Sequence, residues 1–311
     1  MPRFWKMAAI EVQGLSKKFK TVSALRNLSL RVERGEIFGV IGPDGAGKTT
    51  FLRILTGVLE ASAGQVKVCD VDVVKTPDLV KSKIGVVPQN FSLYPDLTVE
   101  ENLNFFRKMY LIAESDFVKR KERLLQITRL NPFLDRRAAQ LSGGMQKKLA
   151  LITCLLHTPE LLILDEPTTG VDPVSRRELW DFLYDLYGQG TTIIISTPYM
   201  DEAERCSRVG FLYRGELLSI DTPSAVREKY PYKIFEITSD NINLIRGLKI
   251  PVDSKVIDSY PVGETLHLVS EQEKPDMIIS FLNEQKVQFE LKQVEPSFED
   301  AFIALIKQKK D

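Results

Sequence analysis

The segment Gly42-Pro-Asp-Gly-Ala-Gly-Lys-Thr49 constrains this chain of 311 residues more than any other feature. It has the form GxxxxGK(S/T), between an apolar run at 37–41 that predicts a strand and a run whose apolar spacing predicts a helix. Glycines here let successive backbone N–H groups face phosphate oxygens, and a helix N-terminus adds partial positive charge. The sequence therefore predicts a nucleotide-binding loop, with Lys48 on the β- and γ-phosphates and the Thr49 hydroxyl on Mg²⁺.

An apolar run that ends in two carboxylates follows at Leu-Leu-Ile-Leu-Asp165-Glu166. Carboxylates commonly end strands, so this pattern alone says little. Beside a phosphate loop it predicts hydrolysis of the bound nucleotide, because Asp165 can hold Mg²⁺ and Glu166 can act as the general base that orients or deprotonates the attacking water.

A third motif, Leu-Ser142-Gly143-Gly144-Met-Gln146, opens a helix predicted at 146–156. A serine and two glycines before a helix present backbone N–H groups to an anion, although an ordinary capped turn has the same appearance. The order of the three motifs along the chain favours a second anion site.

Composition excludes several classes of function. Forty-two basic residues balance forty-two acidic ones, so no overall positive field would hold a polyanion, and we expect no nucleic-acid partner.

The apolar runs are far shorter than the roughly 20 residues that span a bilayer, and the first residues lack the apolar core of a secretory signal. We expect a cytosolic protein that starts at Met1 or Met7. The scattered cysteines, Cys69, Cys154 and Cys206, predict neither disulfides nor a zinc site.

The spacing of apolar residues divides the chain into two predicted domains. Residues 1–229 alternate strand and helix as a parallel α/β sheet does, with a helical insert at about 90–156. Residues 230–311 read strand, helix, strand, strand, helix, strand, with the last strand at 287–291 and a closing helix after it, which suggests a small ferredoxin-like α+β domain. The predicted fold class is an α/β P-loop NTPase core with a small accessory domain.

Together the motifs resemble the ATP-binding subunits of ATP-binding-cassette (ABC) transporters, in family order from about residue 10 to residue 229. Gly-Pro-Asp-Gly-Ala-Gly-Lys-Thr-Thr, Leu-Tyr-Pro-Asp-Leu-Thr-Val-Glu-Glu-Asn-Leu and Gly-Val-Asp-Pro-Val-Ser-Arg-Arg-Glu-Leu-Trp are similar to the branch serving drug, antibiotic and polysaccharide or lipid exporters. Val-Glu-Pro-Ser-Phe-Glu-Asp-Ala-Phe at 294–302 is similar to the appended domain of that branch. The resemblance implies a P-loop core of ABC type, ATP and Mg²⁺ as ligands, and ATP hydrolysis coupled to transport.

The resemblance also assigns individual residues. Phe19 would stack on adenine, although a Phe at a strand end is also common core filler, and Gln89 would sense Mg²⁺ and the γ-phosphate unless it is a solvated loop residue. Asp172 would contact a partner subunit or merely cap the following helix. The residues implied to bind nucleotide are Phe19, Gly42, Pro43, Asp44, Gly45, Ala46, Gly47, Lys48, Thr49, Thr50, Ser142, Gly143, Gly144, Gln146 and Asp172. Metal contacts are implied for Thr49, Gln89 and Asp165, and catalytic roles for Glu166 and Gln89.

The family architecture implies two kinds of protein partner. The phosphate loop of one subunit faces the signature of another, so a homodimer or heterodimer encloses two ATP molecules, and integral-membrane permease subunits dock on the helical insert at the cytoplasmic face of the membrane. Four apolar residues after Gln89 are candidates for that docking surface, with internal packing of the insert as the alternative: Phe91, Leu93, Tyr94 and Leu97.

One position departs from the family pattern. After the strand at 191–195 the family has Ser-Thr-His, and its histidine contacts the γ-phosphate, whereas this chain has Ser196-Thr197-Pro198. Proline has neither a side-chain donor nor an N–H. Losing one such donor slows hydrolysis by on the order of 10²-fold, so we expect a slow ATPase, or normal activity only beside a second, complete nucleotide domain.

Two other readings compete with the exporter ATPase. A soluble ATP-gated module that regulates a partner, with little or no ATPase activity, fits the same motifs. A translation-factor cassette fits poorly, because such factors usually carry two cassettes and a basic linker, whereas this chain has one cassette and no net charge.

Overall fold

The structure, a computed structural model, describes residues 8–90, 93–248, 255–271 and 275–308. Met7, the alternative first residue, lies outside these ranges. The chain divides into two compact units, Met1–Pro223 and Ser224–Asp311. The boundary expected after residue 229 falls just past this division, beyond the end of helix α8 (Pro223–Glu228).

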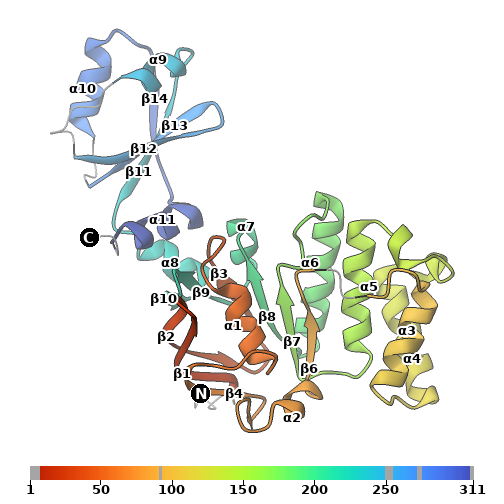
Figure 1. Ribbon diagram of the computed structural model, residues 1–311. Helices are drawn as coiled ribbons and strands as arrows, with labels where there is room; N and C mark the ends of the chain where they lie inside the picture. Colours follow the sequence, from red (N-terminus) through yellow and green to blue (C-terminus); the bar gives the residue numbers. More distant parts are fainter. Residues whose placement is uncertain (1–7, 91–92, 249–254, 272–274, 309–311) are drawn as a thin grey trace, which may run out of the picture. The chain divides into compact units, whose positions relative to one another are not determined.

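The first unit combines two sheets and a set of helices (Figure 1). Its strands are β1 (Ala8–Phe19), β2 (Val22–Glu33), β3 (Ile37–Ile41), β4 (Ala63–Val68), β5 (Val71–Asp72), β6 (Ile84–Val87), β7 (Leu161–Asp165), β8 (Thr192–Thr197), β9 (Arg208–Tyr213) and β10 (Glu216–Asp221). Its helices are α1 (Lys48–Leu55), α2 (Pro77–Lys81), α3 (Val99–Met109), α4 (Glu114–Thr128), α5 (Gly143–Leu155), α6 (Pro173–Gly188) and α7 (Met200–Ala203), with 3-10 turns at Asn131–Phe133 and Ala138–Gln140. Within the described ranges, no helix is long and apolar enough to cross a membrane.

The two sheets differ in strand direction. One is antiparallel with the order β2-β1-β4-β5. The other has the order β10-β9-β3-β8-β7-β6 and is parallel except where β10 pairs with β9. The predicted α/β core with a parallel sheet is confirmed.

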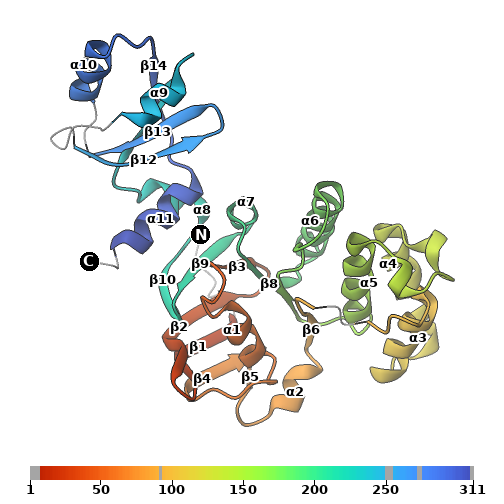
Figure 2. The same ribbon diagram turned by 45° about the horizontal axis from the view of Figure 1, so that its top comes forward.

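Helix α1 connects the two sheets through one hydrophobic core (Figures 1 and 2). Phe51 and Leu55 of α1 are buried in a cluster that includes Val12 of the antiparallel sheet and Phe38 and Ile163 of the parallel sheet. The helix that follows the phosphate loop therefore packs against both sheets.

The predicted helical insert corresponds to α3, α4 and α5, which lie side by side in both views (Figures 1 and 2). Helix α3 begins at a capping box, in which the Thr98 hydroxyl accepts from the Glu101 N–H and the Glu101 carboxylate accepts from the Thr98 N–H. Helix α5 begins at Gly143 rather than at residue 146 as predicted, because the Ser142 hydroxyl caps it.

Apolar spacing alone does not delimit all strands of the first unit. β1 and β2 form a hairpin of two twelve-residue strands, and its register shifts interrupt the alternation of apolar residues. Strand β6 was not predicted, because it has only four residues and one is Gly85. A Cβ at Gly85 would lie 2.8 Å from Leu162 Cδ2 and 3.1 Å from the Cys154 carbonyl oxygen, so glycine leaves room for close packing around this strand.

The second unit has the predicted order of strands and helices. Its elements are β11 (Lys233–Thr238), α9 (Ile242–Gly247), β12 (Val256–Val262), β13 (Thr265–Ser270), α10 (Asp276–Glu284), β14 (Glu290–Val294) and α11 (Phe298–Gln308). The sheet is antiparallel in the order β12-β13-β11-β14. The last strand, predicted at 287–291, lies three residues later, because Val287 and Phe289 pack against the core from the segment before β14.

The three cysteines are buried, and His157 packs against neighbouring groups. Burial raises the pKa of the Cys69 thiol to about 11 and that of Cys154 to about 12, so both thiols stay protonated near neutral pH. His157 Nε2 lies 3.0 Å from the Ile84 carbonyl oxygen, and the His157 ring stacks on Tyr110.

Candidate functional site

Four neighbouring parallel strands, β3, β8, β7 and β6, end at one edge of their sheet. β3 leads into the phosphate loop, β7 ends in Asp165 and is followed by Glu166, and β6 leads to Gln89. Ligands of α/β sheets bind beyond the carboxyl ends of the strands, because that is where the connecting loops meet. The sheet therefore brings the three predicted catalytic or metal-binding regions to one place.

The phosphate loop turns from β3 into α1 through left-handed glycines. Gly45 has a φ of 76° and Gly47 a φ of 108°. A Cβ at Gly47 would lie 2.6 Å from the Ala24 carbonyl oxygen, so no other residue fits. Helix α1 then begins at Lys48 with no acidic side chain in its first turn, so its N–H groups and its dipole favour an anion.

Lys48 and Glu166 form a buried ion pair. The Lys48 side chain is 4% exposed and its Nζ lies 3.2 Å from Glu166 Oε1, whose side chain is 7% exposed. Lys48 Nζ also donates to the carbonyl oxygens of Gly42 at 2.8 Å and Pro43 at 3.2 Å. Buried charges are costly unless they are paired, so each group holds the other in the site.

The Glu166 residue is fixed at both its side chain and its backbone. Its Oε2 accepts from Gln89 Nε2 at 2.9 Å and from Thr169 Oγ1 at 3.3 Å. Its φ of 48° is left-handed, and its N–H donates to the carbonyl oxygen and to the hydroxyl of Ser196, each at 3.1 Å. Strained backbone of this kind persists where surrounding contacts hold it, as at many active sites. Ser196 was not predicted as a site residue, because serine is ordinary at the end of a strand.

The oxygen atoms beside the loop fit Mg²⁺. Thr49 Oγ1 donates to Asp165 Oδ1 at 3.2 Å, and Ser196 Oγ donates to the same oxygen at 2.6 Å. Mg²⁺ prefers carboxylate and hydroxyl oxygens together with phosphate and water. Among the described residues no group of three or more His, Cys, Asp or Glu could hold a metal, so the remaining ligands would have to come from phosphate and water.

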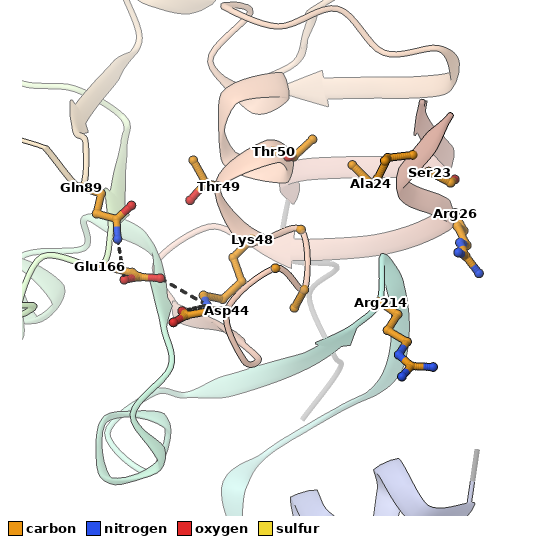
Figure 3. A pocket seen from close by; sticks show the side chains of 14 residues that line it. Ser23, Ala24, Arg26, Asp44, Lys48, Thr49, Thr50, Gln89, Glu166 and Arg214 are labelled. Atoms are coloured by element: carbon orange, nitrogen blue, oxygen red, sulfur yellow. Dashed lines mark hydrogen bonds and ion pairs between the residues drawn. The ribbon is translucent and has the colours of Figure 1, made fainter. Parts of the chain in front are cut away.

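The phosphate loop, Gln89 and Glu166 line a cavity of about 580 Å³, a size typical of ligand sites. Lys48, Gln89 and Glu166 lie together at one end, and Arg26 and Arg214 lie at the other (Figure 3). The complete lining is Val22, Ser23, Ala24, Arg26, Asp44, Gly45, Ala46, Gly47, Lys48, Thr49, Thr50, Gln89, Glu166 and Arg214. The two arginines were not predicted, because nothing in the local sequence marks them as site residues.

Phe19 lies next to this cavity but is not part of its lining. It is 44% exposed, and Lys17 Nζ lies 4.9 Å from the centre of its ring. Its cross-strand partner Val22 does line the cavity. Stacking of Phe19 on adenine stays a prediction.

The signature residues lie elsewhere. None of Ser142, Gly143, Gly144 and Gln146 belongs to the lining of the 580 Å³ cavity. Gly143 and Gln146 instead line a cavity of about 190 Å³, together with Gln89.

Asp172 caps helix α6. Its Oδ1 accepts from the N–H groups of Ser175 at 2.9 Å and Val174 at 3.0 Å. Hydrogen bonds, chiefly from Ser175, hold the pKa of the Asp172 carboxyl below its usual value. The capping alternative is therefore realised within one chain.

The turn after β8 is held by buried polar contacts. Thr197 is fully buried, and its Oγ1 donates to Glu202 Oε2 at 2.6 Å and accepts from the Tyr199 N–H at 3.1 Å. Arg176 Nε of α6 donates to Glu202 Oε1 at 2.6 Å. Pro198 lies half-buried between Thr197 and Tyr199, so it stands in a fixed turn.

The proposed docking surface after Gln89 needs correction. Leu93 is 6% exposed, so the internal-packing alternative holds for it, whereas Tyr94 is 46% exposed and Leu97 is half-buried. Phe91 lies outside the described residues. The fully buried Asn102 explains the difference, because its Nδ2 donates to the carbonyl oxygens of Tyr94 and Leu97 and draws the segment against α3.

Comparison with known proteins gives a consistent result. A family model described as ABC transporter matches residues 25–169. The probable multidrug ABC transporter ATP-binding protein YbhF of Escherichia coli is 39% identical over 306 residues, which are 96% of this chain and 52% of that protein. The chain thus spans about half the length of that relative. The Nod factor export ATP-binding protein I of Bradyrhizobium diazoefficiens is 35% identical over 299 residues, 96% of either chain.

Solved structures agree with these relatives. One described as an ATP-binding subunit of an ABC transporter has a TM-score of 0.66 and 29% identity, and covers 71% of this chain and 93% of that one. An ATP-binding cassette solved as a dimer in a post-hydrolysis state, bound to ADP and Pi, has a TM-score of 0.63 and 26% identity, and covers 68% of this chain and 98% of that one.

Proposed function

The chain belongs to the family of ABC transporter ATP-binding proteins, and we propose that it binds ATP with Mg²⁺, hydrolyses the ATP and thereby powers a membrane exporter. One observation carries the proposal: the buried contact of Lys48 Nζ with Glu166 Oε1 at 3.2 Å, beside the oxygens of Thr49 and Asp165. Lys48, Glu166 and Thr49 line one cavity, and Asp165 accepts a hydrogen bond from Thr49, which supports a phosphate-binding cation, a base and Mg²⁺ ligands at one site.

The contacts of Lys48 indicate how binding prepares hydrolysis. The β- and γ-phosphate oxygens compete with Glu166 for the Lys48 ammonium, so ATP binding frees one carboxylate oxygen for water while Gln89 still holds the other. Glu166 then orients the attacking water and takes its proton. Bound Mg²⁺, held by Thr49 and Asp165, would supply positive charge to the phosphate oxygens.

Pro198 supports slow hydrolysis. It stands at the end of β8, next to the strand of Asp165, where the family pattern has a histidine that contacts the γ-phosphate. The Thr197 hydroxyl and the Tyr199 N–H are both engaged within this turn, by Glu202 and by Thr197 respectively.

Dimerisation and docking complete the proposal. The signature residues of a chain lie outside its own nucleotide cavity, which supports a second subunit as their target. A solved relative is dimeric, and curated relatives are named for multidrug transport and Nod factor export. We place the protein at the cytoplasmic face of the membrane, bound to permease subunits.

Two measurements test the function. Purified protein should release phosphate from ATP in a Mg²⁺-dependent manner, and the Glu166→Gln variant, which keeps shape but removes the base, should bind ATP and release on the order of 10³-fold less. Equal release by both proteins would contradict the assigned base.

The alternative function is an ATP-gated regulatory module with little ATPase activity, which the missing histidine at 198 favours. Affinity capture of the intact protein from detergent-solubilised membranes distinguishes the two. Recovery of an integral-membrane subunit supports the exporter, and its absence together with undetectable hydrolysis supports the regulatory module.

A further inference from the structure

Lys147 lies on α5, close behind the signature residues that open this helix. Its side chain is half-buried, and its Nζ donates to the Gln89 carbonyl oxygen at 2.8 Å. We propose that Lys147 is a positioning residue that holds Gln89, and through it Glu166, so that the hydrolytic centre depends on the position of the signature helix. This inference rests on the proposed function and deepens it.

A continuous series of contacts connects α5 to the phosphate loop. Lys147 holds the Gln89 backbone, the Gln89 amide nitrogen donates to Glu166 Oε2 at 2.9 Å, and Glu166 Oε1 lies 3.2 Å from Lys48 Nζ. Each step joins a different element: α5, the segment after β6, the end of β7 and the start of α1. A displacement at the first contact therefore reaches the base and the phosphate-binding lysine.

Packing alone does not fix the segment that carries Gln89. Gln89 is exposed, and the cavity of about 190 Å³ separates its segment from α5 and from the residues after Glu166. Lys147 lines this cavity and spans it with its long side chain. A charge-assisted hydrogen bond is stronger than a neutral one, so it can hold the segment where close packing is lacking.

Because Lys147 lies on the signature helix, its contact with Gln89 would couple the two nucleotide sites of the proposed dimer. Helix α5 begins at Gly143, within the signature. In the proposed dimer the signature faces the ATP of the other subunit. If contact with the partner subunit's ATP shifts α5, Lys147 shifts with the helix and Gln89 shifts with Lys147. One subunit's nucleotide would thus adjust the base that serves the other nucleotide.

The adjacent Lys148 provides a matched control. It lies on the same helix but pairs with Glu178 of α6, away from Gln89. Lys147→Met and Lys148→Met remove the same charge and keep similar side-chain volume. Lys147→Arg keeps a cationic donor and serves as the rescue variant.

We expect Lys147→Met to lower the kcat for ATP hydrolysis about tenfold, the effect of losing one charge-assisted hydrogen bond, with little change in ATP affinity. Lys147→Arg should retain most of the kcat, and Lys148→Met should remain near the unaltered protein. Nucleotide affinity is measured without Mg²⁺ by fluorescent-nucleotide titration, and thermal unfolding reports on the fold of each variant. An unchanged kcat in folded Lys147→Met overturns the inference.

A double-mutant cycle separates positioning from general destabilisation. If Lys147 acts through the Gln89 side chain, Lys147→Met should cost about tenfold alone but almost nothing in a Gln89→Ala background. Equal losses in both backgrounds would show that Lys147 acts elsewhere and overturn the inference. Absence of hydrolysis by the unaltered protein would instead overturn the proposed function itself, and the inference with it.

Discussion

The loops that follow β3 and β8 stand side by side, since Ile41 pairs with Thr197 at the ends of these strands, yet they are built for different tasks. The first places a buried ammonium, Lys48, among carbonyl oxygens and a carboxylate. Before the second, Ser196 at the end of β8 donates to Asp165 Oδ1 and accepts from the Glu166 N–H, and the loop then continues with Pro198, which has no side-chain donor. The difference indicates that ATP binding and ATP hydrolysis depend on separate loops. Mutations in one loop should therefore change ATP affinity, and mutations in the other should change kcat.

The largest effect should come from the first loop. Lys48→Met removes the ammonium that binds the β- and γ-phosphates, and we expect ATP affinity to fall on the order of 10²-fold. Fluorescent-nucleotide titration without Mg²⁺ measures this affinity. Lys67→Met, an exposed lysine of β4, controls for the change in net charge. Unchanged ATP affinity in a folded Lys48→Met variant would contradict the assignment of ATP binding to the loop after β3.

A smaller effect should come from Ser196. Ser196→Ala removes the hydroxyl that donates to Asp165 Oδ1 at 2.6 Å and accepts from the Glu166 N–H. We expect kcat to fall about tenfold and the Mg²⁺ requirement to rise, while ATP affinity without Mg²⁺ stays constant. Ser196→Thr, which keeps the hydroxyl, should retain activity. A loss of affinity without a loss of kcat would assign Ser196 to binding and contradict the division between the loops.

The smallest effect should come from Phe19, which lies beside the cavity without lining it. Phe19→Ala removes the ring beside Val22, and loss of aromatic stacking on adenine should weaken ATP binding about threefold, with kcat unchanged. Inorganic triphosphate, which has no base, is the matched ligand, because its affinity should not change. An equal loss for both ligands would show that Phe19 supports the loop rather than the base.

Sequence was informative where the chemistry itself requires particular residues. The glycines and Lys48 of the phosphate loop, and the acidic pair at the end of β7, are dictated by local backbone and charge. Their pattern predicted that they lie close together, and the structure has Lys48 paired with Glu166 and Thr49 in contact with Asp165. The parallel core and the order of elements in the second unit followed from apolar spacing.

Sequence was uninformative where a role depends on distant contacts. Ser196, Lys147 and Arg214 are ordinary residues until the sheet and α5 bring them beside Asp165, Gln89 and the cavity. Leu93 looked exposed because the sequence does not show that Asn102 draws its segment inward. Strand β14 was misplaced because apolar residues before it serve the core rather than the sheet.

We infer that the chain binds ATP fully but hydrolyses it slowly because Pro198 replaces a γ-phosphate donor. Steady-state phosphate release from saturating Mg²⁺-ATP tests this most directly. We expect Pro198→His to raise kcat by up to on the order of 10²-fold, because an imidazole donor can contact the γ-phosphate, while ATP affinity stays constant. An equal or lower kcat in the folded variant would contradict it.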